Sequence, residues 1–410
     1  MSTENKVKLY GFGAVGQGFH SYLVDNGQED RLHTVIVKDG NKKRKPIKAI
    51  LETTNPNTAK DKTMHAIIEL ISSAEEAYGI VYENLEIGKN VVSANKKLIA
   101  YHLEELIEAE KNNNGRFLYE GAVCGSIPII RVLNDLFGND PVRKVSGIFN
   151  GSSNYILSKL FNDNISYQEA LKQAQELGFA EADPTSDVGG YDALYKLIIV
   201  AAHAFGKIVH PDEVLNIGIQ NISLSDIEFA KKYHLKIKLI AKSALEGDKL
   251  ILSVLPTFVN SENDLYTVEN EYNAVLVESD NIGQHFYKGK GAGSLPTGSV
   301  VYSDLKAIDA GYSYSYSKLN KQTIQLANEE KINVIISAAT SAAIQNTGID
   351  ISNFTSINIE GTQLIGKIAL DDLRKGKAAI EQQQVSVIVI EDEQLIKELI
   401  LTPAKEEVKI

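Results

Sequence analysis

The chain has 410 residues, more than one ordinary hydrophobic core accommodates, so two or three domains are expected. Its 43% hydrophobic and 23% charged content is typical of a soluble globular protein. The net charge of −11 argues against nucleic acid as a partner, because phosphate binding needs a basic surface. It also gives no support for binding to anionic membranes, and no apolar run reaches the roughly 18 residues of a spanning helix.

The N-terminal sequence and the cysteine content point to the same cellular location. Residues 1–13 pass from a polar leader directly into a predicted strand, without the apolar stretch of a signal peptide. The single cysteine, Cys124, excludes an internal disulfide framework and a cysteine-rich metal site. We therefore expect a cytoplasmic protein that binds neither nucleic acid nor membrane.

A glycine-rich turn follows the first predicted strand, at residues 6–10, and precedes a helix that is predicted to run through Val24. The turn consists of Gly11, Phe12, Gly13, Ala14, Val15 and Gly16. In a dinucleotide site the first glycine permits the tight turn, the second lets the backbone approach a pyrophosphate, and the third lets the helix pack on the strand. The N–H groups at the helix start attract phosphate. The pattern predicts dinucleotide binding, although such turns also occur without a ligand.

The second strand, predicted at residues 33–38, ends where the ribose of a dinucleotide would be recognised. An Asp or Glu is expected there, about 20 residues past the last glycine. Here Lys38 comes first and Asp39 follows. Four more cations come close behind, namely Lys42, Lys43, Arg44 and Lys45. This cluster favours the 2′-phosphate of NADP, while a solvated basic loop with Asp39 on the ribose of NAD is the alternative.

Two further strands, at residues 67–70 and 90–93, are predicted to be parallel and to end near the cofactor. Ser72 and Lys96 lie just past their C-terminal ends, where ligands of open α/β sheets bind. Lys96 is therefore placed where a reacting carbonyl would sit. The adjacent Lys97 is expected to point elsewhere.

The loop after a strand predicted at residues 117–120 is short of charged side chains. A cation there would be held by backbone carbonyls together with Glu120. A tight connection into a helix at Pro128 is the simpler interpretation. Cys124 lacks an adjacent histidine, so a packed thiol is favoured over a nucleophile.

The middle of the chain predicts an antiparallel sheet and two turns of interest. Alternating runs at residues 250–255 and 273–277 indicate the sheet. After a strand at residues 145–149, Ser152 and Ser153 are placed to cap a helix or to present hydroxyls to a ligand. The glycine-rich run at residues 289–298 opens another helix, and such freedom indicates close approach to a cofactor or to neighbouring backbone. His203 is expected to be a hydrogen-bonded core residue.

Residues 178–206 concentrate ionisable groups beside an apolar segment. Glu181, Asp183 and Asp187 lie in a loop that contains proline and glycine. Asp192 and Lys196 follow at i,i+4 spacing, which places an acid and an amine on one helix face. Carboxylates in a loop suit an ammonium ligand, while a solvated loop with an ordinary surface pair is the alternative.

Six motifs in order over about residues 6–310 resemble those of homoserine dehydrogenases. They are GFGAVGQGF, VVSANK, YEGAVCGSIPII, IFNGSSNYIL, GFAEADPTSDVGGYDALYK and GKGAGSLPTGSVVYSDL. The resemblance implies reversible NAD(P)H-dependent reduction of L-aspartate 4-semialdehyde to L-homoserine. It also implies a homodimer or higher homo-oligomer, formed through the middle domain.

The resemblance also implies roles for individual residues. Lys196 corresponds to the proton donor, and Lys96 to a lysine that assists near the nicotinamide and the substrate. The positions that match the substrate site are Glu181, Asp192, Asp187, Gly151 and Ser152. The ligands of a monovalent cation, usually sodium, map to Glu120, Val123, Gly125 and Ile127. Gly291 corresponds to a glycine that contacts the cofactor.

The expected fold is α/β, with a Rossmann-type dinucleotide-binding domain at residues 1–145, completed by about residues 298–325. An α+β substrate and dimerisation domain is expected at residues 146–297, and a small C-terminal α/β module at residues 326–410. In that module, strands are predicted at 333–337, 354–359 and 385–390, with a helix at 363–375. A divergent regulatory ACT-like domain fits this pattern, but no amino-acid-binding signature is evident, so feedback by threonine is an open hypothesis.

The sequence is also compatible with two other functional classes. One is a different aldehyde or amino-acid dehydrogenase, such as one that works through Cys124. The other is a non-catalytic nucleotide sensor, which would have no reason to carry Lys196 and Lys96 at these positions.

Overall fold

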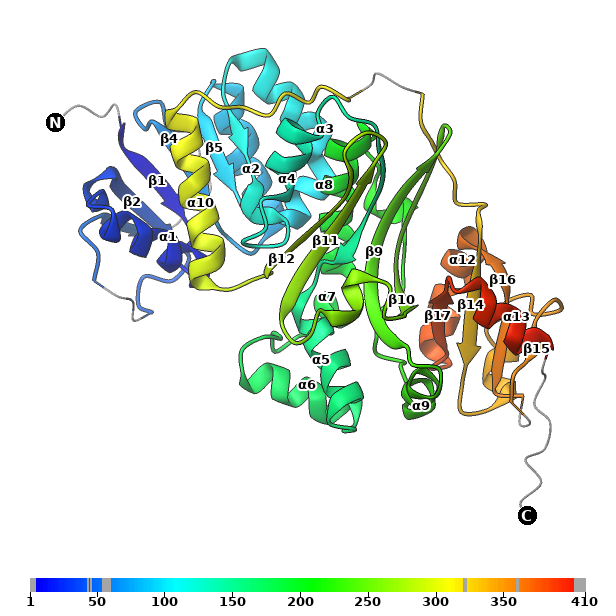
Figure 1. Cartoon of the computed structure of the whole chain (residues 1–410). Helices are drawn as coiled ribbons and strands as arrows, with labels where there is room; N and C mark the ends of the chain where they lie inside the picture. The colour runs from blue at the N-terminus through cyan, green and yellow to red at the C-terminus, as the bar shows by residue number, and fades with distance from the viewer. Residues whose placement is uncertain are drawn as a thin grey trace. The chain divides into compact units, whose positions relative to one another are not determined.

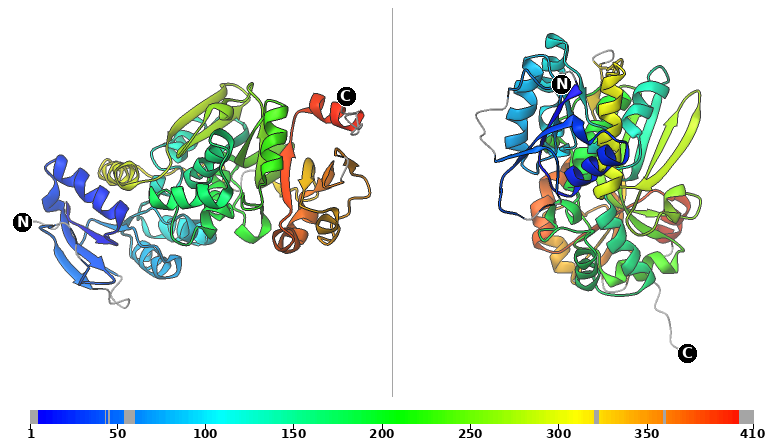
Figure 2. Two further views of the ribbon diagram at one scale, coloured as in Figure 1. Left: turned by 90° about the horizontal axis from the view of Figure 1, so that it is seen from below. Right: turned by 90° about the vertical axis from the view of Figure 1, so that its left-hand side faces the viewer.

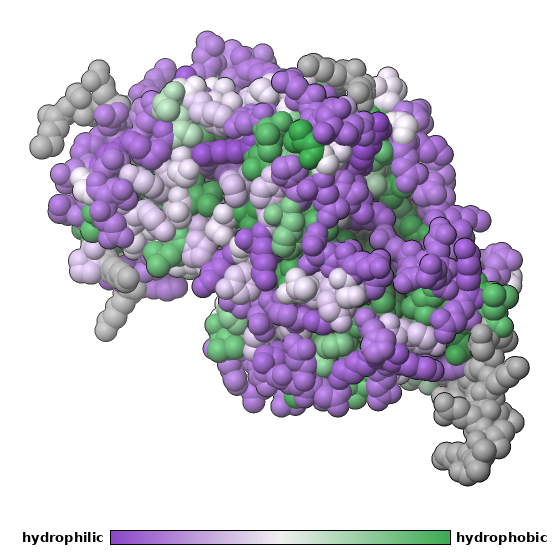
Figure 3. Space-filling view, viewed as in Figure 1, coloured by the Kyte–Doolittle hydropathy of each residue, from purple (hydrophilic) through white to green (hydrophobic). Residues whose placement is uncertain are grey.

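The computed structural model describes residues 5–42, 44, 46–53, 60–319, 323–358 and 361–401. The chain forms two compact units. The first comprises Met1–Pro141, Ile198–Pro211 and Gly289–Gln322, and the second comprises Val142–Leu197, Asp212–Lys288 and Thr323–Ile410. No helix in the described ranges is both long and apolar enough to cross a membrane. The face shown in Figure 3 is mainly hydrophilic, with scattered hydrophobic residues.

The first unit is built on a six-stranded sheet in the order β3-β2-β1-β4-β5-β6, with every pair parallel (Figure 1). Its strands are β1 (Val7–Tyr10), β2 (Leu32–Val37), β3 (Ile50–Thr53), β4 (Ala66–Glu69), β5 (Asn90–Ser93) and β6 (Phe117–Leu118). The order reverses between β1 and β4, and this reversal defines the Rossmann arrangement and its ligand crevice. The predicted parallel strands are therefore confirmed. The strand expected at residues 117–120 is shorter, because Glu120–Ala122 turn into a 3-10 helix.

Helices cover this sheet. They are α1 (Ala14–Asp25), α2 (Ala74–Glu86), α3 (Lys96–Asn113), the short α4 (Ile129–Arg131) and α10 (Ser294–Asp309). Helices α1 and α10 pack closely, because a Cβ added to Gly298 would lie 2.4 Å from the carbonyl carbon of Gly18. The late glycine-rich run thus brings backbone against neighbouring backbone, which is one of the two alternatives that the sequence left open.

The second unit contains a mixed sheet in the order β12-β11-β7-β9-β10-β17-β14-β16-β15. Most of these strands are labelled in Figure 1, and Figure 2 shows the ribbon from two further directions. The strands of its first half are β7 (Val142–Ile148), β8 (Leu215–Asn216), β9 (Lys236–Glu246), β10 (Lys249–Val259), β11 (Tyr272–Ser279) and β12 (Gly283–Lys290). The accompanying helices are α5 (Gly151–Asn162), α6 (Tyr167–Glu176), α7 (Thr185–Val188), α8 (Tyr191–Phe205) and α9 (Leu224–Lys232). The pairs β7–β11, β7–β9 and β9–β10 are antiparallel, as predicted.

The C-terminal segment continues the same sheet. Its elements are β13 (Gln325–Leu326), β14 (Lys331–Ser337), α11 (Ser341–Gln345), β15 (Thr355–Ser356), β16 (Gln363–Ala369), α12 (Leu370–Gln382), β17 (Ser386–Ile390) and α13 (Glu393–Leu401). From β14 to β17 the chain follows a β-α-β-β-α-β path, as in ferredoxin-like modules. Strand β17 joins the module to β10 through a short parallel pair.

One expectation for this segment is wrong. The helix predicted at residues 363–375 begins only at Leu370, and residues 363–369 form strand β16. All seven residues of β16 pair with β14, and Gly366 lies against the ring of Phe354. Tertiary pairing therefore outweighs the weak helical pattern of this stretch.

Candidate active site

The glycine-rich turn of the first unit has the shape that a pyrophosphate needs. Gly11 has a φ of +90°, and a Cβ there would lie 2.5 Å from the carbonyl oxygen of Leu70. A Cβ on Gly16 would lie 2.4 Å from the oxygen of Gly11, whereas a Cβ on Gly13 would meet nothing within 4 Å. Two of the glycines are therefore required by close packing, and the third borders open space. The residues fit a dinucleotide phosphate at the start of α1, which has no side-chain cap.

The remaining residues of the turn take different places. Ala14 and Val15 form the first turn of α1, and the carbonyl of Ala14 accepts a hydrogen bond from Ser294 Oγ at 2.6 Å. Phe12 is buried and its ring packs edge-on against His20, so only its backbone belongs to the turn. Gly291 packs its backbone within 2.6 Å of the ideal Cβ position of Gly125.

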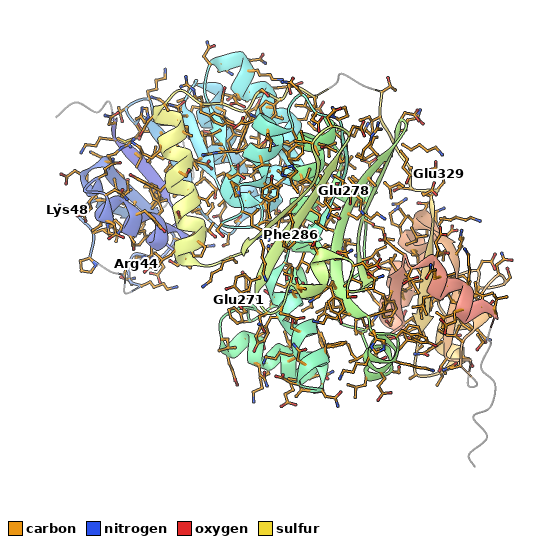
Figure 4. All side chains as sticks on the ribbon, in the orientation of Figure 1. Arg44, Lys48, Glu271, Glu278, Phe286 and Glu329 are labelled. Carbon is orange, nitrogen blue, oxygen red and sulfur yellow. The ribbon has the colours of Figure 1, made fainter. Side chains whose placement is uncertain are left out.

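Lys38 lies directly after β2, where the ribose was expected. Its side chain is 89% exposed, and its Nζ lies 3.9 Å from Glu76 Oε1. Arg44 donates to the carbonyl of Lys42, and Arg44 and Lys48 are labelled on the first unit in Figure 4. Two cations of the predicted cluster, at positions 43 and 45, lie outside the described residues.

Glu69, which the sequence did not single out, braces the two loops that carry Ser72 and Lys96. It ends strand β4 and is fully buried. Its Oε1 accepts a hydrogen bond from the N–H of Ile71 at 2.7 Å, and its Oε2 accepts one from Ser93 Oγ at 2.5 Å. Burial raises its pKa to about 7 against these hydrogen bonds.

Asn95 extends this network. Its N–H donates to Ser93 Oγ, and its Nδ2 donates to the carbonyl of Ile71 at 3.2 Å. Its Oδ1 caps α3 by accepting from the N–H of Leu98. Lys96 is the first residue of that helix, and Ser72 is exposed on the loop after β4. The two loops are thus bound to each other beside the ends of β4 and β5.

The loop proposed to hold a cation has an unusual backbone. Cys124 and Gly125 are consecutive residues with positive φ, 52° and 55°. This conformation is rare for a residue that carries a side chain. Ile127 follows and donates its N–H to the carbonyl of Cys124 at 3.1 Å. Cys124 is fully buried, in keeping with a packed thiol.

Glu120, on the strand side of this loop, is buried among charged groups. Its carboxylate accepts the N–H groups of Ile130 and Arg131, each at 2.8 Å. Burial, followed by the neighbouring charge of Asp304, raises its pKa to about 8. Asp304 forms an ion pair with Arg131, and burial raises its pKa to about 6. Two backbone N–H groups thus hold the carboxyl group of Glu120, and the loop proposed to hold a cation follows Glu120 directly in the sequence.

The second unit gathers the predicted substrate residues around Asn150. Lys196 Nζ lies 2.7 Å from Asp192 Oδ2, with side chains only 8% and 7% exposed, and it donates to the carbonyl of Phe149 at 2.7 Å. Asn150 Nδ2 donates to Asp192 Oδ2 at 2.9 Å and to Asp187 Oδ1 at 2.7 Å. The i,i+4 pair is therefore a buried ion pair, and the surface-pair interpretation of Asp192 and Lys196 is wrong.

Asn150 also caps α5, which corrects the capping expectation. Its Oδ1 accepts the N–H of Ser153 at 2.7 Å, whereas Ser152 Oγ donates to the carbonyl of Phe179 at 2.5 Å. Gly151 begins the helix, and a Cβ there would lie 2.5 Å from the carbonyl oxygen of Glu271. Neither serine caps the helix with its side chain. The FNGSSN motif held this signal, because asparagine before a helix is among the strongest caps.

The carboxylates of the loop before α7 have separate places. Asp183 Oδ1 accepts from both the N–H and the hydroxyl of Thr185, so Asp183 closes the turn that starts α7. These two hydrogen bonds lower the pKa of Asp183. Glu181 is exposed, and its backbone carbonyl accepts a hydrogen bond from Gln175.

His203, in the part of α8 that belongs to the first unit, is a core residue as expected. Its Nε2 lies 2.8 Å from Tyr119 Oη, and the side chain is buried. Burial lowers the pKa of His203 to about 3, so the ring is neutral. The described residues contain no group of three or more His, Cys, Asp or Glu side chains that could hold a metal ion.

A Rossmann-order sheet with a glycine cradle at the start of α1, joined in one chain to a buried acid–lysine pair, defines an NAD(P)-dependent oxidoreductase. Comparisons with known proteins agree. Residues 11–120 match the family described as "Homoserine dehydrogenase, NAD binding domain", and residues 128–305 match "Homoserine dehydrogenase". The chain belongs to the homoserine dehydrogenase family.

Individual relatives carry the same name. The homoserine dehydrogenase of Bacillus subtilis is 38% identical over 314 residues, which are 74% of this chain and 72% of that protein. That of Helicobacter pylori is 36% identical over 313 residues, 74% of each chain. Among solved structures, a homoserine dehydrogenase from Thiobacillus denitrificans superposes with a TM-score of 0.77 at 28% identity, covering 94% of this chain and 98% of that one. Enzymes of this family act on the CH–OH group of homoserine in the aspartate pathway, which leads to threonine and methionine.

Proposed function

We propose that Lys196 is the proton donor in the interconversion of L-aspartate 4-semialdehyde and L-homoserine. The observation that carries this proposal is its buried ion pair with Asp192. An ammonium has three N–H donors, and Asp192 and the carbonyl of Phe149 hold two of them, which fixes where the third one points. A reduced nicotinamide supplies the hydride when it is bound. Lys196 then neutralises the oxygen of the former carbonyl by giving it a proton.

We further propose that the carboxylates around Asn150 bind the amino group of the substrate. Asp187 and Asp192 are held by one amide, and Glu181 stands on the neighbouring exposed turn. Gly151 and Ser152 would line the same side at the start of α5. Lys96, at the start of α3, would assist near the nicotinamide. These roles are supported by the matching motifs and by the buried geometry of the pair.

Steady-state kinetics of Lys196→Ala test the proposal. Loss of a general acid lowers turnover by about 10²–10⁴-fold, while binding of NAD(P) should survive because the cofactor turn lies in the other unit. The chain offers a matched control, Lys172→Ala, since Lys172 also pairs at i,i+4 with an acid but is 76% exposed. The control should keep full activity. Wild-type turnover in Lys196→Ala would exclude this site.

For the cofactor, we propose that NADP is preferred over NAD. The exposed Lys38 at the end of β2 supports this preference, since an ammonium there can meet a 2′-phosphate without displacing a buried partner. A solved hyperthermophilic archaeal homoserine dehydrogenase was determined in complex with NADPH; at 24% identity its likeness concerns the fold.

We propose that a monovalent cation, sodium in the first place, binds the carbonyls of Val123, Gly125 and Ile127 with the carboxylate of Glu120. The two successive left-handed residues turn the backbone of this loop sharply, which supports a site lined by several carbonyl groups of one short segment. Replacement of sodium by the bulky N-methylglucamine ion should lower activity, and sodium should restore it. Activity that is the same in both salts would exclude the site.

We also propose a cytoplasmic homodimer. Strand β12 ends the larger sheet, and Phe286 on it is 39% exposed, which leaves an apolar residue on an open edge (Figure 4).

The order β17-β14-β16-β15 of the C-terminal segment supports a divergent ACT-like module at residues 326–410, attached to a Rossmann domain and a middle domain with the boundaries given above.

A further inference from the structure

Helix α12 of the C-terminal segment reaches the turn that precedes Asp192. Lys377 Nζ donates to Tyr191 Oη at 3.1 Å and to Asn216 Oδ1 at 2.9 Å. The same ammonium lies 4.4 Å from the centroid of the Tyr191 ring and 3.9 Å from Glu381 Oε1. Its side chain is 18% exposed, so these contacts are largely shielded from water. One cation thus holds the first residue of α8 by its hydroxyl and by its ring.

Asn216 carries this contact to the backbone of the turn. It is 4% exposed, and its Nδ2 donates to the carbonyl of Gly189 at 2.7 Å. An ammonium only donates and a carbonyl only accepts, so the amide of Asn216 has a single orientation between them. Gly190 follows with a φ of +79°, and α8 starts at the next residue. Lys377 therefore contacts Tyr191 directly and Gly189 through Asn216, on either side of Gly190.

The position of Lys377 is itself fixed by packing. Leu373 and Ile380 of α12 share one buried cluster with Leu215 and Ile217, which flank Asn216. The N–H of Ile219 donates to the carbonyl of Val188 at 2.8 Å, which holds the turn from its other side. Because α12 is anchored by this packing, the ammonium of Lys377 is held at a defined position beside the turn.

We propose that Lys377 is a positioning residue of the substrate site. It fixes the turn at Gly189–Tyr191 and thereby the carboxylates of Asp187 and Asp192, which lie on either side of that turn. The C-terminal segment then contributes directly to substrate affinity within one chain. This inference rests on the proposed role of the two carboxylates in binding the substrate's amino group.

The test compares Lys377→Met with Lys375→Met in the full-length enzyme. Lys375 lies on the same helix, is 69% exposed and pairs with Asp371. For Lys377→Met we expect the KM for homoserine to rise about tenfold, as for loss of a hydrogen bond to a charged group, with the KM for NADP unchanged. Lys377→Arg keeps a cation and its donors and should recover most of the affinity. Lys375→Met should match the wild type.

A purely structural role would give a different pattern. It would lower the amount of active enzyme, and hence apparent kcat, while leaving both KM values unchanged; that result, or a rise in both KM values, overturns the proposal. If Lys377→Met fails to fold, Tyr191→Phe removes one acceptor and keeps the ring, and the KM for homoserine should still rise, by about threefold. An unchanged KM there overturns it too. Lys196→Ala distinguishes failure of the Lys377 proposal from failure of the proposed substrate site. If Lys196→Ala keeps the turnover of the wild type, the proposed site itself is rejected.

Discussion

The buried carboxyl of Glu69 should make the stability of the protein fall as pH rises. Its pKa is raised from 4.5 to about 7 by burial. Between these values the folded chain keeps a proton that the unfolded chain releases, so the free energy of unfolding decreases as pH rises through this window. The loss in the free energy of unfolding amounts to about 3 kcal/mol. It is complete above pH 7 and absent below pH 4.5.

Glu69→Gln removes this titration and keeps the shape. The amide oxygen can still accept from the N–H of Ile71, and its NH₂ can donate to the hydroxyl of Ser93. At pH 8 the variant should therefore be more stable than the wild type by up to about 3 kcal/mol, and at pH 5 by less than about 1 kcal/mol. Cofactor affinity at pH 5 should be retained, because the glutamine still connects the loops that carry Ser72 and Lys96.

Urea unfolding followed by circular dichroism at the two pH values measures this effect, as the chain has no tryptophan for fluorescence. Glu108→Gln is the control, because Glu108 is exposed on α3 of the same unit and makes the same change of charge. Other buried carboxyls titrate alike in variant and wild type and therefore cancel. A stability gain that is equal at both pH values, or none at either, would refute the reasoning.

Three further outcomes can be checked by steady-state kinetics. Lys38→Gln should lower kcat/KM for NADP about tenfold more than for NAD, with the exposed Lys97→Gln as the control; equal losses would argue against the preference for NADP. Asn150→Asp replaces a donor to two carboxylates by a third carboxylate, so kcat/KM for homoserine should fall about 10- to 100-fold, and unchanged kinetics would show that the bridge is dispensable. Cys124→Ser should keep activity within about threefold, whereas abolished turnover in a folded variant would favour a thioester mechanism.

The features that could be predicted from the sequence are those formed by residues close together in the chain. A strand, a GxGxxG turn and a helix follow one another within about 20 positions, so the roles of Gly11 and Gly16 can be derived without knowing the fold. The pairing of Asp192 with Lys196 is equally local, because i,i+4 residues share a helix face. Sequence alone did not give the burial of this pair, since burial depends on what packs over that face.

The missed residues act through distant partners. Asn150 is 37 residues from Asp187 and 42 from Asp192, and Glu69 is 24 residues from Ser93. In the sequence these residues look like an ordinary helix cap and an ordinary strand end. Their roles arise only when parallel strands bring their carboxyl ends together, or when α8 folds back toward the start of α5. No spacing rule contains that information.

The C-terminal segment shows a different limit. Sequence relatives align over about three quarters of the chain, whereas a solved structure covers 94% of it. Structural similarity therefore extends over more of the chain than the sequence alignment does. In this segment the strand at Gln363–Ala369 depends on pairing with β14, and a local reading assigns it to a helix. The contact of Lys377 with Tyr191 joins residues far apart in the sequence, so no local pattern predicts it.

The formal charges of the proposed substrate site give a physical reason why it would favour an amino acid. Asp187 and Asp192 bring two formal negative charges around one amide, and Lys196 returns one positive charge, so these three side chains together carry a formal charge of −1. In the proposed site, the α-ammonium of the substrate would offset this negative charge, and an aldehyde without an amino group would lack that interaction. Selectivity then comes from the cost of the wrong ligand as much as from contacts with the right one. An amide between the two acids preserves this balance, because Asn150 donates to both carboxylates without adding a charge of its own.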